Sequence, residues 1–443
     1  MSGINNRMKI ALFILGAGHH LSSWRLSLEE NPFSYDYNLE VTRLAEKGKL
    51  DFVFFADGLY IDEYSHTNVL NALEPTVLLS SLAAQTNQIG LAATASTTFN
   101  EPFNIARRFG SIDHISKGRS AWNIVTTADH GSAKNFSFNE HMEHGKRYRR
   151  AEEFVEVVKG LWDSWEYDAW IQDKEQGVFV DYNKIHKINH QGEFFAVEGP
   201  LNLSRPPQGH PVLIQAGTST SGQQLAAKYA EVVFVNNNKG IDNAKAYYEN
   251  LKEQAVSFDR NRDEVVITSG IRFILGETQD IAQQKYNELQ SLIDPNIGLK
   301  LLSIILPQVN FLAMDLNKPL ADLEETLDEE QTKKYLTYKK FSEKRKLNLK
   351  QLSQHVASIS PHDLFIGTPE QLADKMEIWY KAGACDGFNL MPLNMIEDLE
   401  VFIHKVVPIL QQKNMFREEY EGVSLRENLG LVNPSYRTKT ANS

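Results

Sequence analysis

The sequence predicts an α/β fold, a (β/α)8 TIM barrel with insertions, in which eight parallel strands alternate with covering helices. Two observations support this prediction. Short apolar runs alternate with segments of helical periodicity along most of the chain, and there are eight such runs, the number that closes a barrel. Because 443 residues exceed the roughly 250 of an average barrel, we expect one domain, 1–443, that carries insertions.

The eight apolar runs are each short enough for a single strand. We expect these strands at 8–15, 51–55, 88–95, 119–125, 211–216, 231–235, 265–275 and 386–392. The intervening segments have helical spacing, as at 37–50 and 74–87. Gly48 fits the C-terminal cap of the first of these helices, and Pro75 fits the first turn of the second.

Three segments depart from this alternation. Residues from about 162 to 209 are rich in aromatic side chains and polar turns, and residues from about 292 to 361 are helical and charged. The composition of the second insertion favours a solvated helix. Insertions after barrel strands also lie over the rim where ligands bind, where they act as lids or dimer contacts. The last segment, from about 424 to 443, is expected to form an extended tail.

The composition restricts the class of partner. The net charge of −11 gives no basic field for a nucleic acid or an anionic membrane. The apolar run near the N-terminus is too short to span a membrane and lacks a small-residue cleavage site, so we expect a cytoplasmic protein. The single cysteine, Cys385, excludes an internal disulfide and is expected in the core. A small-molecule substrate is therefore expected.

The first strand ends in a sequence that imitates a dinucleotide-binding turn. Gly16 and Gly18 are in place, but Leu21 stands at the third glycine position and no helix start follows. We therefore predict a loop that carries His19 and His20 over the barrel mouth. Consecutive side chains of a strand cannot both point to one site, so a surface role and a catalytic role both stay open.

Two pairs of histidines have helical spacing, His141 with His144 and His186 with His190. Neither pair has a third ligand at a recognisable distance in the sequence. Catalytic zinc requires three protein ligands and an open position. We therefore predict no metal site.

Polar residues follow several predicted strands, at the end where a barrel binds its ligands. Asp57 follows the second strand and Thr94 ends the third. After the fifth strand, the sequence GTSTSG at 217–222 precedes an amphipathic helix. Hydroxyl groups and free N–H groups at a helix N-terminus suit a phosphate, although simple N-capping selects the same residues.

Five blocks in fixed order resemble the bacterial-luciferase-like flavin monooxygenases: FADGLY, GLAATASTTFNEPFNIARRF, GRSAWNIVTT, HGKRYRRAEEFVEVVKGLWDSW and LIQAGTSTSGQQLAAKYAEVVF. The similarity continues in FIGTPEQLADKMEIWYKAGACDGFNLMP and SLRENLGL. The closest branch contains the nitrilotriacetate, pristinamycin and dibenzothiophene-sulfone monooxygenases. The resemblance implies a barrel enzyme that takes reduced FMN from a separate NAD(P)H:flavin reductase. With O2 it would oxidise a small organosulfur or organonitrogen compound, and carboxylated compounds are among the candidates.

The resemblance also implies which residues hold FMN. At the isoalloxazine and ribityl end they are Asp57, Thr94, Asn123 and Thr127. At the phosphate end they are His144, Tyr148, Thr218, Ser219 and Thr220.

The oxidant implied by the resemblance is a flavin hydroperoxide, which survives only in a dry, closable site. The catalytic candidates all come from the predicted barrel mouth and are His130, Tyr60, His20 and His19. His130 ranks first because it continues the fourth strand into the rim loop. Each of the four has a structural role as its alternative.

Two other functions fit the same pattern, a deazaflavin-dependent reductase and a flavin-binding protein without oxygenase activity. A metal-dependent barrel hydrolase is a weaker alternative. Arg25, Lys134 and Arg272 are the candidates for pairing with a substrate carboxylate. We also expect a homodimer or a higher homo-oligomer.

Overall fold

The fold is a closed barrel of eight parallel strands. The computed structural model describes residues 7–62, 70–217, 219–322 and 327–434. Neighbouring strands pair in parallel all the way round, and the pairing of β10 with β11 closes the circle. The barrel strands are β1 (Lys9–Ile14), β2 (Phe52–Phe55), β3 (Gly90–Ser96), β4 (Ser120–Val125), β9 (Val212–Gln215), β10 (Val232–Val235), β11 (Val266–Leu275) and β13 (Gly387–Pro392). Each coincides with one predicted apolar run, so the predicted fold is confirmed.

Successive side chains of each strand point into two different buried environments. Both environments are apolar, so each strand is a continuous apolar run in the sequence rather than an alternation of apolar and polar residues. Side chains such as Leu12 and Val53 face outward into a large core shared with the helices. Their neighbours, such as Phe52 and Phe54, face the barrel interior. This alternation decides which side chains reach the mouth of the barrel, at the carboxyl ends of the strands.

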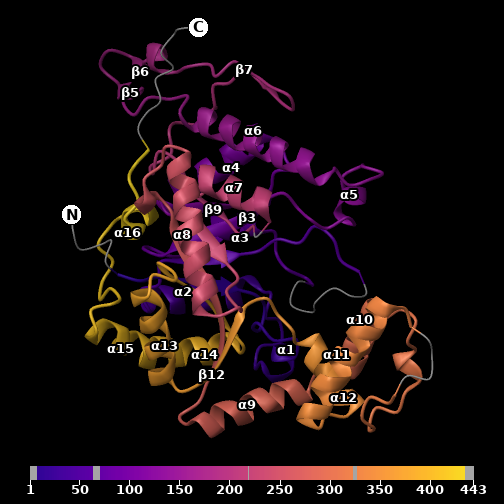
Figure 1. The fold of residues 1–443 in the computed structure, drawn as a ribbon. Coiled ribbons are helices and arrows are strands. Elements are labelled where there is room, and N and C mark those ends of the chain that lie inside the picture. The colour runs from indigo at the N-terminus through magenta and orange to yellow at the C-terminus, as the bar shows by residue number, and fades with distance from the viewer. Residues whose placement is uncertain (1–6, 63–69, 218, 323–326, 435–443) are drawn as a thin grey trace.

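Helices surround the barrel (Figure 1). Gly48 caps the C-terminus of α2 and Pro75 is the first residue of α3, as the sequence predicts. The helices are α1 (Ser23–Leu26), α2 (Tyr35–Lys47), α3 (Pro75–Ala83), α4 (Pro102–Ser116), α5 (Ser132–Asn135), α6 (His144–Trp162), α7 (Thr220–Tyr229), α8 (Ile241–Ser257), α9 (Gln279–Ser291), α10 (Pro295–Ile305), α11 (Glu329–Arg345), α12 (Leu349–Ala357), α13 (Pro369–Lys381), α14 (Met395–Val401), α15 (Val407–Gln412) and α16 (Leu425–Leu429). None of the helices in the described ranges is long and apolar enough to cross a membrane.

The first insertion forms two small antiparallel hairpins after α6. β5 (Trp170–Asp173) pairs with β6 (Val178–Val180), and β7 (His190–Gln191) pairs with β8 (Ala196–Val197). They lie beyond α6 in Figure 1, on the side away from α9 and α13. These strands are too short and too exposed to give an apolar run in the sequence.

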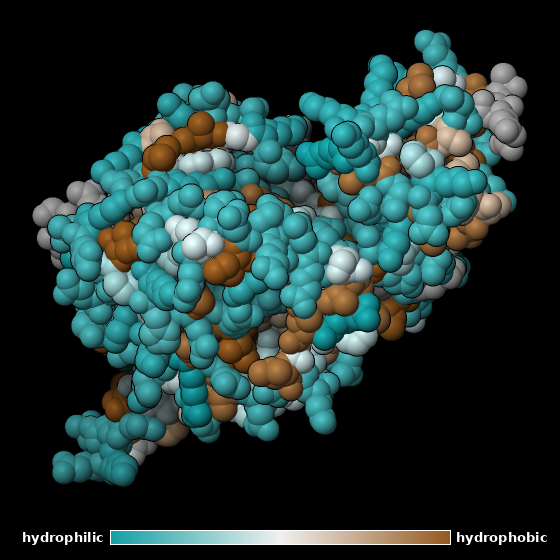
Figure 2. All heavy atoms as spheres, turned by 90° about the horizontal axis from the view of Figure 1, so that it is seen from below, coloured by the Kyte–Doolittle hydropathy of each residue, from teal (hydrophilic) through white to brown (hydrophobic). Residues whose placement is uncertain are grey.

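The second insertion forms a separate lobe of α10, α11 and α12 beside α9 (Figure 1). It has its own small core, which includes Leu302, Tyr335 and Leu352. After it, β12 (Asp363–Gly367) adds a ninth strand that pairs with the far end of β11 alone. The view from below shows a largely hydrophilic surface on which apolar side chains form small, separate patches (Figure 2).

The C-terminal segment closes the bottom of the barrel, at the amino ends of the strands. Leu425, Leu429 and Leu431 pack against inward-facing side chains such as Phe52. The expectation of an extended tail needs correction here, because residues 425–429 form α16. A reciprocal capping box explains this helix: the Ser424 hydroxyl accepts the Glu427 N–H, and the Glu427 carboxylate accepts the Ser424 N–H.

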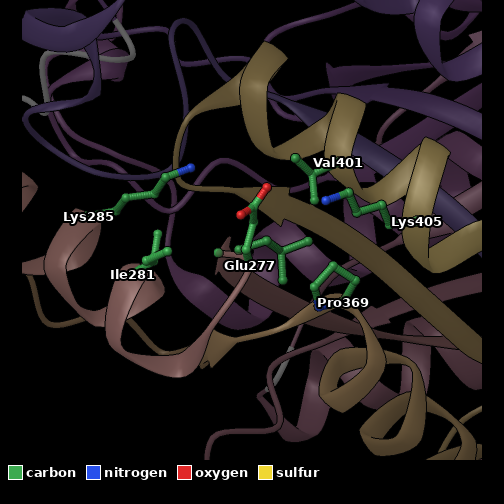
Figure 3. Close-up of a pocket in the computed structure, with 8 residues that line it drawn as sticks. Glu277, Ile281, Lys285, Pro369, Val401 and Lys405 are labelled. Atoms are coloured by element: carbon green, nitrogen blue, oxygen red, sulfur yellow. The ribbon is translucent and has the colours of Figure 1, made fainter.

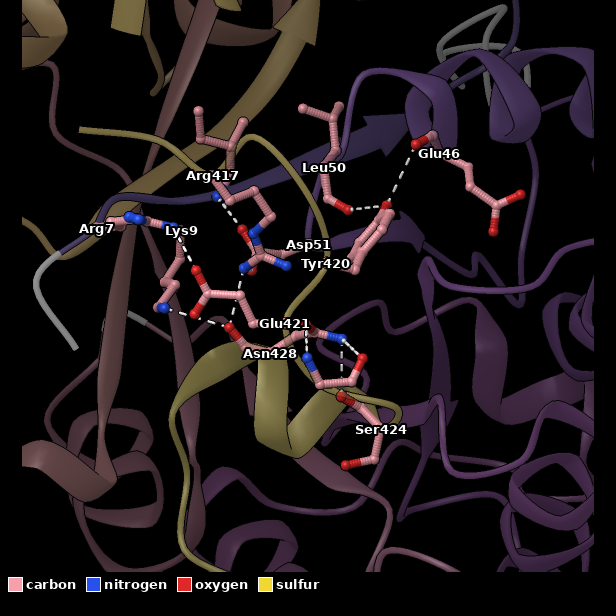
Figure 4. Close-up of polar contacts among 12 residues, drawn as sticks. Arg7, Lys9, Glu46, Leu50, Asp51, Arg417, Tyr420, Glu421, Ser424 and Asn428 are labelled. Atoms are coloured by element: carbon pink, nitrogen blue, oxygen red, sulfur yellow. Dashed lines mark hydrogen bonds and ion pairs between the residues drawn. The ribbon is translucent and has the colours of Figure 1, made fainter. Parts of the chain in front are cut away.

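Ion pairs fasten this segment to the barrel (Figure 4). Buried Asp51 accepts the Ile10 N–H at 2.6 Å and pairs with the guanidinium of Arg417. Arg417 also donates to the Asn428 carbonyl at 2.9 Å, and the Lys9 ammonium donates to the same oxygen at 3.3 Å. The bottom of the barrel is therefore sealed by apolar packing and by opposite charges.

Candidate functional site

Two inward-facing residues of adjacent strands meet at the barrel mouth. Thr94 of β3 stands beside Asn123 of β4, and the Asn123 amide donates to the Thr94 hydroxyl at 2.8 Å. Both side chains are buried. The Asn123 Oδ1 has no hydrogen-bond partner among the described residues. A buried carbonyl oxygen without a partner is an acceptor available to a ligand.

The rim above this pair is held in an unusual backbone conformation. Thr127 has φ +46°, which is uncommon for a β-branched residue. Its hydroxyl donates to Ser96 at 2.7 Å, and its carbonyl accepts from Arg147 at 2.6 Å and from the His141 ring at 2.8 Å. These three contacts hold a strained residue in place, as is common at binding sites.

Asp57 follows β2 and lies half-buried at the rim. Burial raises the pKa of its carboxyl to about 6, and the nearby Glu74 carboxylate adds to the shift. The carboxyl therefore stays protonated to a higher pH than the carboxyl of an exposed aspartate does. Asp57 can accept hydrogen bonds when ionised and donate one when protonated.

A cradle for an anion lies at the start of α7. Ser219 is the N-cap residue, and its hydroxyl accepts the Gly222 N–H at 3.1 Å. The Tyr148 hydroxyl, from α6, lies 3.3 Å from the same oxygen. A side chain on Gly217 would come within 3.1 Å of the Gly222 backbone, so the loop folds closely over the helix start. Hydroxyl groups and the N–H groups of the first turn therefore converge on one exposed point.

The other residues that are predicted to hold the phosphate differ in where they lie. Thr220 is the exposed first residue of α7, and Thr218 lies outside the described residues. His144 begins α6 and its ring lies 4.9 Å from that of Tyr148. His141 precedes the helix, so the expected helical pairing of His141 with His144 is wrong. Glu143 explains the start at His144, because its carboxylate caps the helix by accepting from Gly145 and Lys146.

The arginines at the start of α6 do not face the cradle. Arg147 donates to the carbonyls of the rim loop, Arg149 pairs with Glu193, and Arg150 donates to the Thr97 carbonyl. Their role is to position loops. The cradle is therefore formed by hydroxyl groups and backbone N–H groups rather than by a cluster of positive charge.

His130 and Tyr60 both lie at the exposed rim after β4 and β2. The Tyr60 ring occupies the space where a side chain on Gly131 would stand, at 2.5 Å. The His130 ring lies 5.3 Å from that of His141. These two catalytic candidates therefore come from neighbouring points of the mouth.

His19 and His20 are buried in the loop after β1. His19 Nε2 donates to the Phe13 carbonyl at 2.8 Å, and its ring lies edge-on to that of Phe13 at 4.7 Å. His20 Nδ1 accepts the Ser22 N–H at 3.1 Å, and its ring lies near Tyr286 of α9. The two rings thus diverge as the geometry of consecutive residues requires, and both stabilise the loop.

Three inward-facing phenylalanines, which sequence reasoning missed, form the floor of the mouth. The ring of Phe13 lies 4.9 Å from that of Phe54 and 6.2 Å from that of Phe234, and all three meet edge to face. They occupy inward positions near the ends of three strands. The alternation of inward-facing and outward-facing positions along each strand was the signal that could have identified them.

A surface cavity of about 280 Å³ lies away from these residues, behind the end of β11 and between α9 and α13 (Figure 3). Glu277, Lys285 and Lys405 contribute its charged side chains. None of the predicted site residues lines this cavity. In the ranges that the structure describes, no three histidine, cysteine, aspartate or glutamate side chains are placed to hold a metal ion.

Comparisons with known proteins agree with this geometry. The family profile described as luciferase-like monooxygenase matches residues 8–385. The chain is 48% identical to the N-acetyl-S-(2-succino)cysteine monooxygenase of Bacillus subtilis, over 99% of each chain. It is 41% identical to nitrilotriacetate monooxygenase component A of Aminobacter aminovorans, over 98% of each chain. A solved riboflavin lyase with modified FMN and riboflavin superposes with a TM-score of 0.80, 28% identity and 96% coverage of each chain.

These similarities span the barrel, both insertions and the residues of the mouth. Relatives at 41% and 48% identity are monooxygenases, which decides against a reductase, a hydrolase or a binding protein without activity. The chain belongs to the luciferase-like monooxygenases and is a flavin-dependent monooxygenase.

Proposed function

We propose that this monooxygenase takes reduced FMN from a separate flavin reductase and oxidises a small thioether that carries carboxylates. The observation that carries the proposal is the 48% identity, over 99% of both chains, with an enzyme that acts on N-acetyl-S-(2-succino)cysteine. The name "component A" of the nitrilotriacetate relative supports the reductase, because it denotes one part of a system of several proteins. We place this system in the cytoplasm and expect the chain to form a homodimer or a higher homo-oligomer.

The donor set at the mouth fits FMN. Ser219, Tyr148 and the first turn of α7 suit the phosphate, because they supply hydroxyl and N–H donors at an exposed point. Thr94 and Asn123 suit the polar edge of the ring, because Asn123 Oδ1 is an acceptor without a described partner. Asp57 and Thr127 would lie between these two ends, while Thr218, Thr220 and His144 would complete the phosphate end.

When bound, reduced FMN supplies the two electrons with which O2 gives one oxygen atom to the substrate and one to water. The protein has to position the substrate and exclude bulk water. The floor of Phe13, Phe54 and Phe234 serves the second need, because its packed aromatic rings offer water no hydrogen-bonding group. His130 and Tyr60 are the proposed proton donors to the substrate side, and the two insertions are the proposed lids.

Purified protein with FMN, NADH and a flavin reductase tests this proposal. Under ¹⁸O2, we expect oxidation of N-acetyl-S-(2-succino)cysteine with one labelled oxygen in the product, and no product without the reductase. The matched control replaces the chain with buffer, since free reduced FMN also makes hydrogen peroxide. Absence of labelled product from every carboxylated thioether and amine offered would contradict the proposal.

A further inference from the structure

A buried arginine faces the barrel mouth without an acidic partner. Arg272 lies on β11 in phase with Gly270 and with the inward-facing Val266, and it is 5% exposed. Its one hydrogen bond among the described residues is long, 3.4 Å from Nη1 to the Ser358 carbonyl. Its Nε has no partner there, and no described carboxylate pairs with it. Because buried charges are almost always paired, this guanidinium is prepared for an anion that comes from outside the chain.

Two further polar groups lie beside this arginine. The His362 ring stacks on that of Phe234 at 5.2 Å and 3°, and it occupies the space over Gly270. A Cβ atom at Gly270 would come within 2.5 Å of His362 Nδ1, so glycine is required there. Asn389 of β13 stands opposite Gly270 in the strand register. Within the described ranges, His362 Nδ1 and Asn389 Oδ1 both lack hydrogen-bond partners.

The charge of this cluster selects the kind of ligand. Burial lowers the pKa of His362 to about 4, and the positive charge of Arg272 adds to the shift, so the ring is neutral at cellular pH. The cluster therefore holds one permanent positive charge and two neutral polar groups. A planar guanidinium binds a carboxylate through two parallel, charge-assisted hydrogen bonds, which are stronger than those that it makes to a neutral ligand.

The cluster also lies across the mouth from the proposed flavin residues. In the closed barrel, β11 is four strands away from β3, which carries Thr94, and is therefore on the opposite wall. A ligand held at Arg272 would face a ring held at Thr94 and Asn123. This is the arrangement that a bound substrate needs.

We propose that Arg272, with His362 and Asn389 beside it, binds a carboxylate of the substrate and so selects carboxylated substrates. This inference rests on the proposed function, because it assigns the opposite wall of the same mouth to the substrate. The competing source of negative charge is the reduced flavin ring, which the test below distinguishes.

The test compares Arg272→Met with Arg272→Lys. The methionine keeps an unbranched apolar side chain without charge, whereas the lysine keeps the charge but lacks the two parallel N–H donors of the guanidinium. Arg43→Met is the matched control, because Arg43 is an exposed arginine of α2 that donates to the Gln85 side chain and lies outside the proposed site. Calorimetry without flavin measures the affinity for N-acetyl-S-(2-succino)cysteine, for nitrilotriacetate and for their methyl esters. A separate anaerobic titration measures the affinity for reduced FMN.

We expect Arg272→Met to weaken binding of the acids on the order of 10- to 100-fold and Arg272→Lys to weaken it less, since a charged hydrogen bond contributes roughly 1.5 to 3 kcal/mol. Binding of the esters is already weak in the unmodified protein, and Arg43→Met has no effect. In turnover, Arg272→Met raises KM for the acids more than it lowers kcat. The affinity for reduced FMN stays unchanged.

Three results would overturn the inference: equal affinity for acids and esters in the unmodified protein, no binding of either acid, or a loss of reduced-FMN affinity in Arg272→Met as large as the loss for the acids. The first comparison needs no variant, so it holds even where a substitution impairs folding. Failure of the unmodified protein to bind reduced FMN would instead contradict the proposed function. These two failures are thus distinguishable.

Discussion

The two ends of the barrel differ in whether their buried charges are paired within the described residues. At the bottom, Asp51 pairs with Arg417, and α16 fills the opening with leucines. At the mouth, Asn123 Oδ1, Arg272 Nε and His362 Nδ1 have no partner among the described residues. A buried guanidinium without a counter-charge is destabilising, so Arg272 is kept at the mouth at the expense of stability. The same eight strands thus end in a sealed face and in a face prepared for ligands.

We expect the largest effect from a variant that removes an ion pair at the sealed bottom of the barrel. Arg417→Met leaves the Asp51 carboxylate buried without its counter-charge, and we expect a loss of roughly 3–5 kcal/mol in the free energy of unfolding. Urea denaturation measures this loss. Arg7→Met is the control, because the Arg7–Glu421 pair is partly exposed and contributes at most about 1 kcal/mol. Equal losses in the two variants would contradict the account of the bottom.

The apolar packing of α16 against the bottom of the barrel gives the next largest effect. Leu425 is fully buried, and we expect Leu425→Ala to lower the free energy of unfolding by roughly 2–5 kcal/mol, because the cavity forms among rigid strands. Val423→Ala is the control two residues away, where the side chain is 72% exposed. The affinity for reduced FMN should stay unchanged in both variants. A loss of affinity would mean that the bottom and the mouth are coupled.

In contrast to variants at the bottom, variants at the mouth should change the affinity for reduced FMN and leave the free energy of unfolding almost unchanged. Tyr148→Phe and Ser219→Gly each remove a hydroxyl from the cradle, and we expect each to weaken reduced-FMN binding by about tenfold or more. Glycine is chosen because it serves as an N-cap with a loss of only a few tenths of a kcal/mol. Anaerobic fluorescence titration measures the affinity. Unchanged affinity in the double variant would place the phosphate elsewhere.

The smallest of the expected effects on stability concerns pH. The pKa of His362 is about 4 in the folded chain and about 6.5 when unfolded, so the unfolded chain binds more protons between these values. Stability from the neutral ring is therefore complete above pH 6.5 and is lost as the pH falls toward 4. We expect this loss to be roughly 2 kcal/mol at pH 4.5 in the unmodified protein and absent from His362→Gln. Thermal unfolding from pH 7 to pH 4.5 compares them, and parallel curves would contradict the assignment.

The sequence was sufficient for the barrel because its strands are buried on both faces and therefore form continuous apolar runs. It was insufficient for β12, which is half-buried and pairs on one side only, and for the exposed hairpins β5–β6 and β7–β8. The helix α16 carried a readable signal, since Ser424 and Glu427 have capping-box spacing.

For the site, local sequence predicted polar residues near or after the ends of strands, such as Thr94 and Ser219, and the family resemblance added Asn123. It did not predict His362, which reaches the barrel from the loop after a long insertion and meets Gly270 only in the folded chain. The phenylalanine floor was missed because apolar residues inside and outside a barrel strand look alike in sequence.

The most direct test of the account is hydrogen exchange with and without reduced FMN under anaerobic conditions. We predict slower exchange at 94–97, 123–127, 144–148 and 219–223, and no change at 417–431, because only the mouth binds the ligand. Protection confined to the bottom, or to the cavity lined by Glu277, Lys285 and Lys405, would contradict the account.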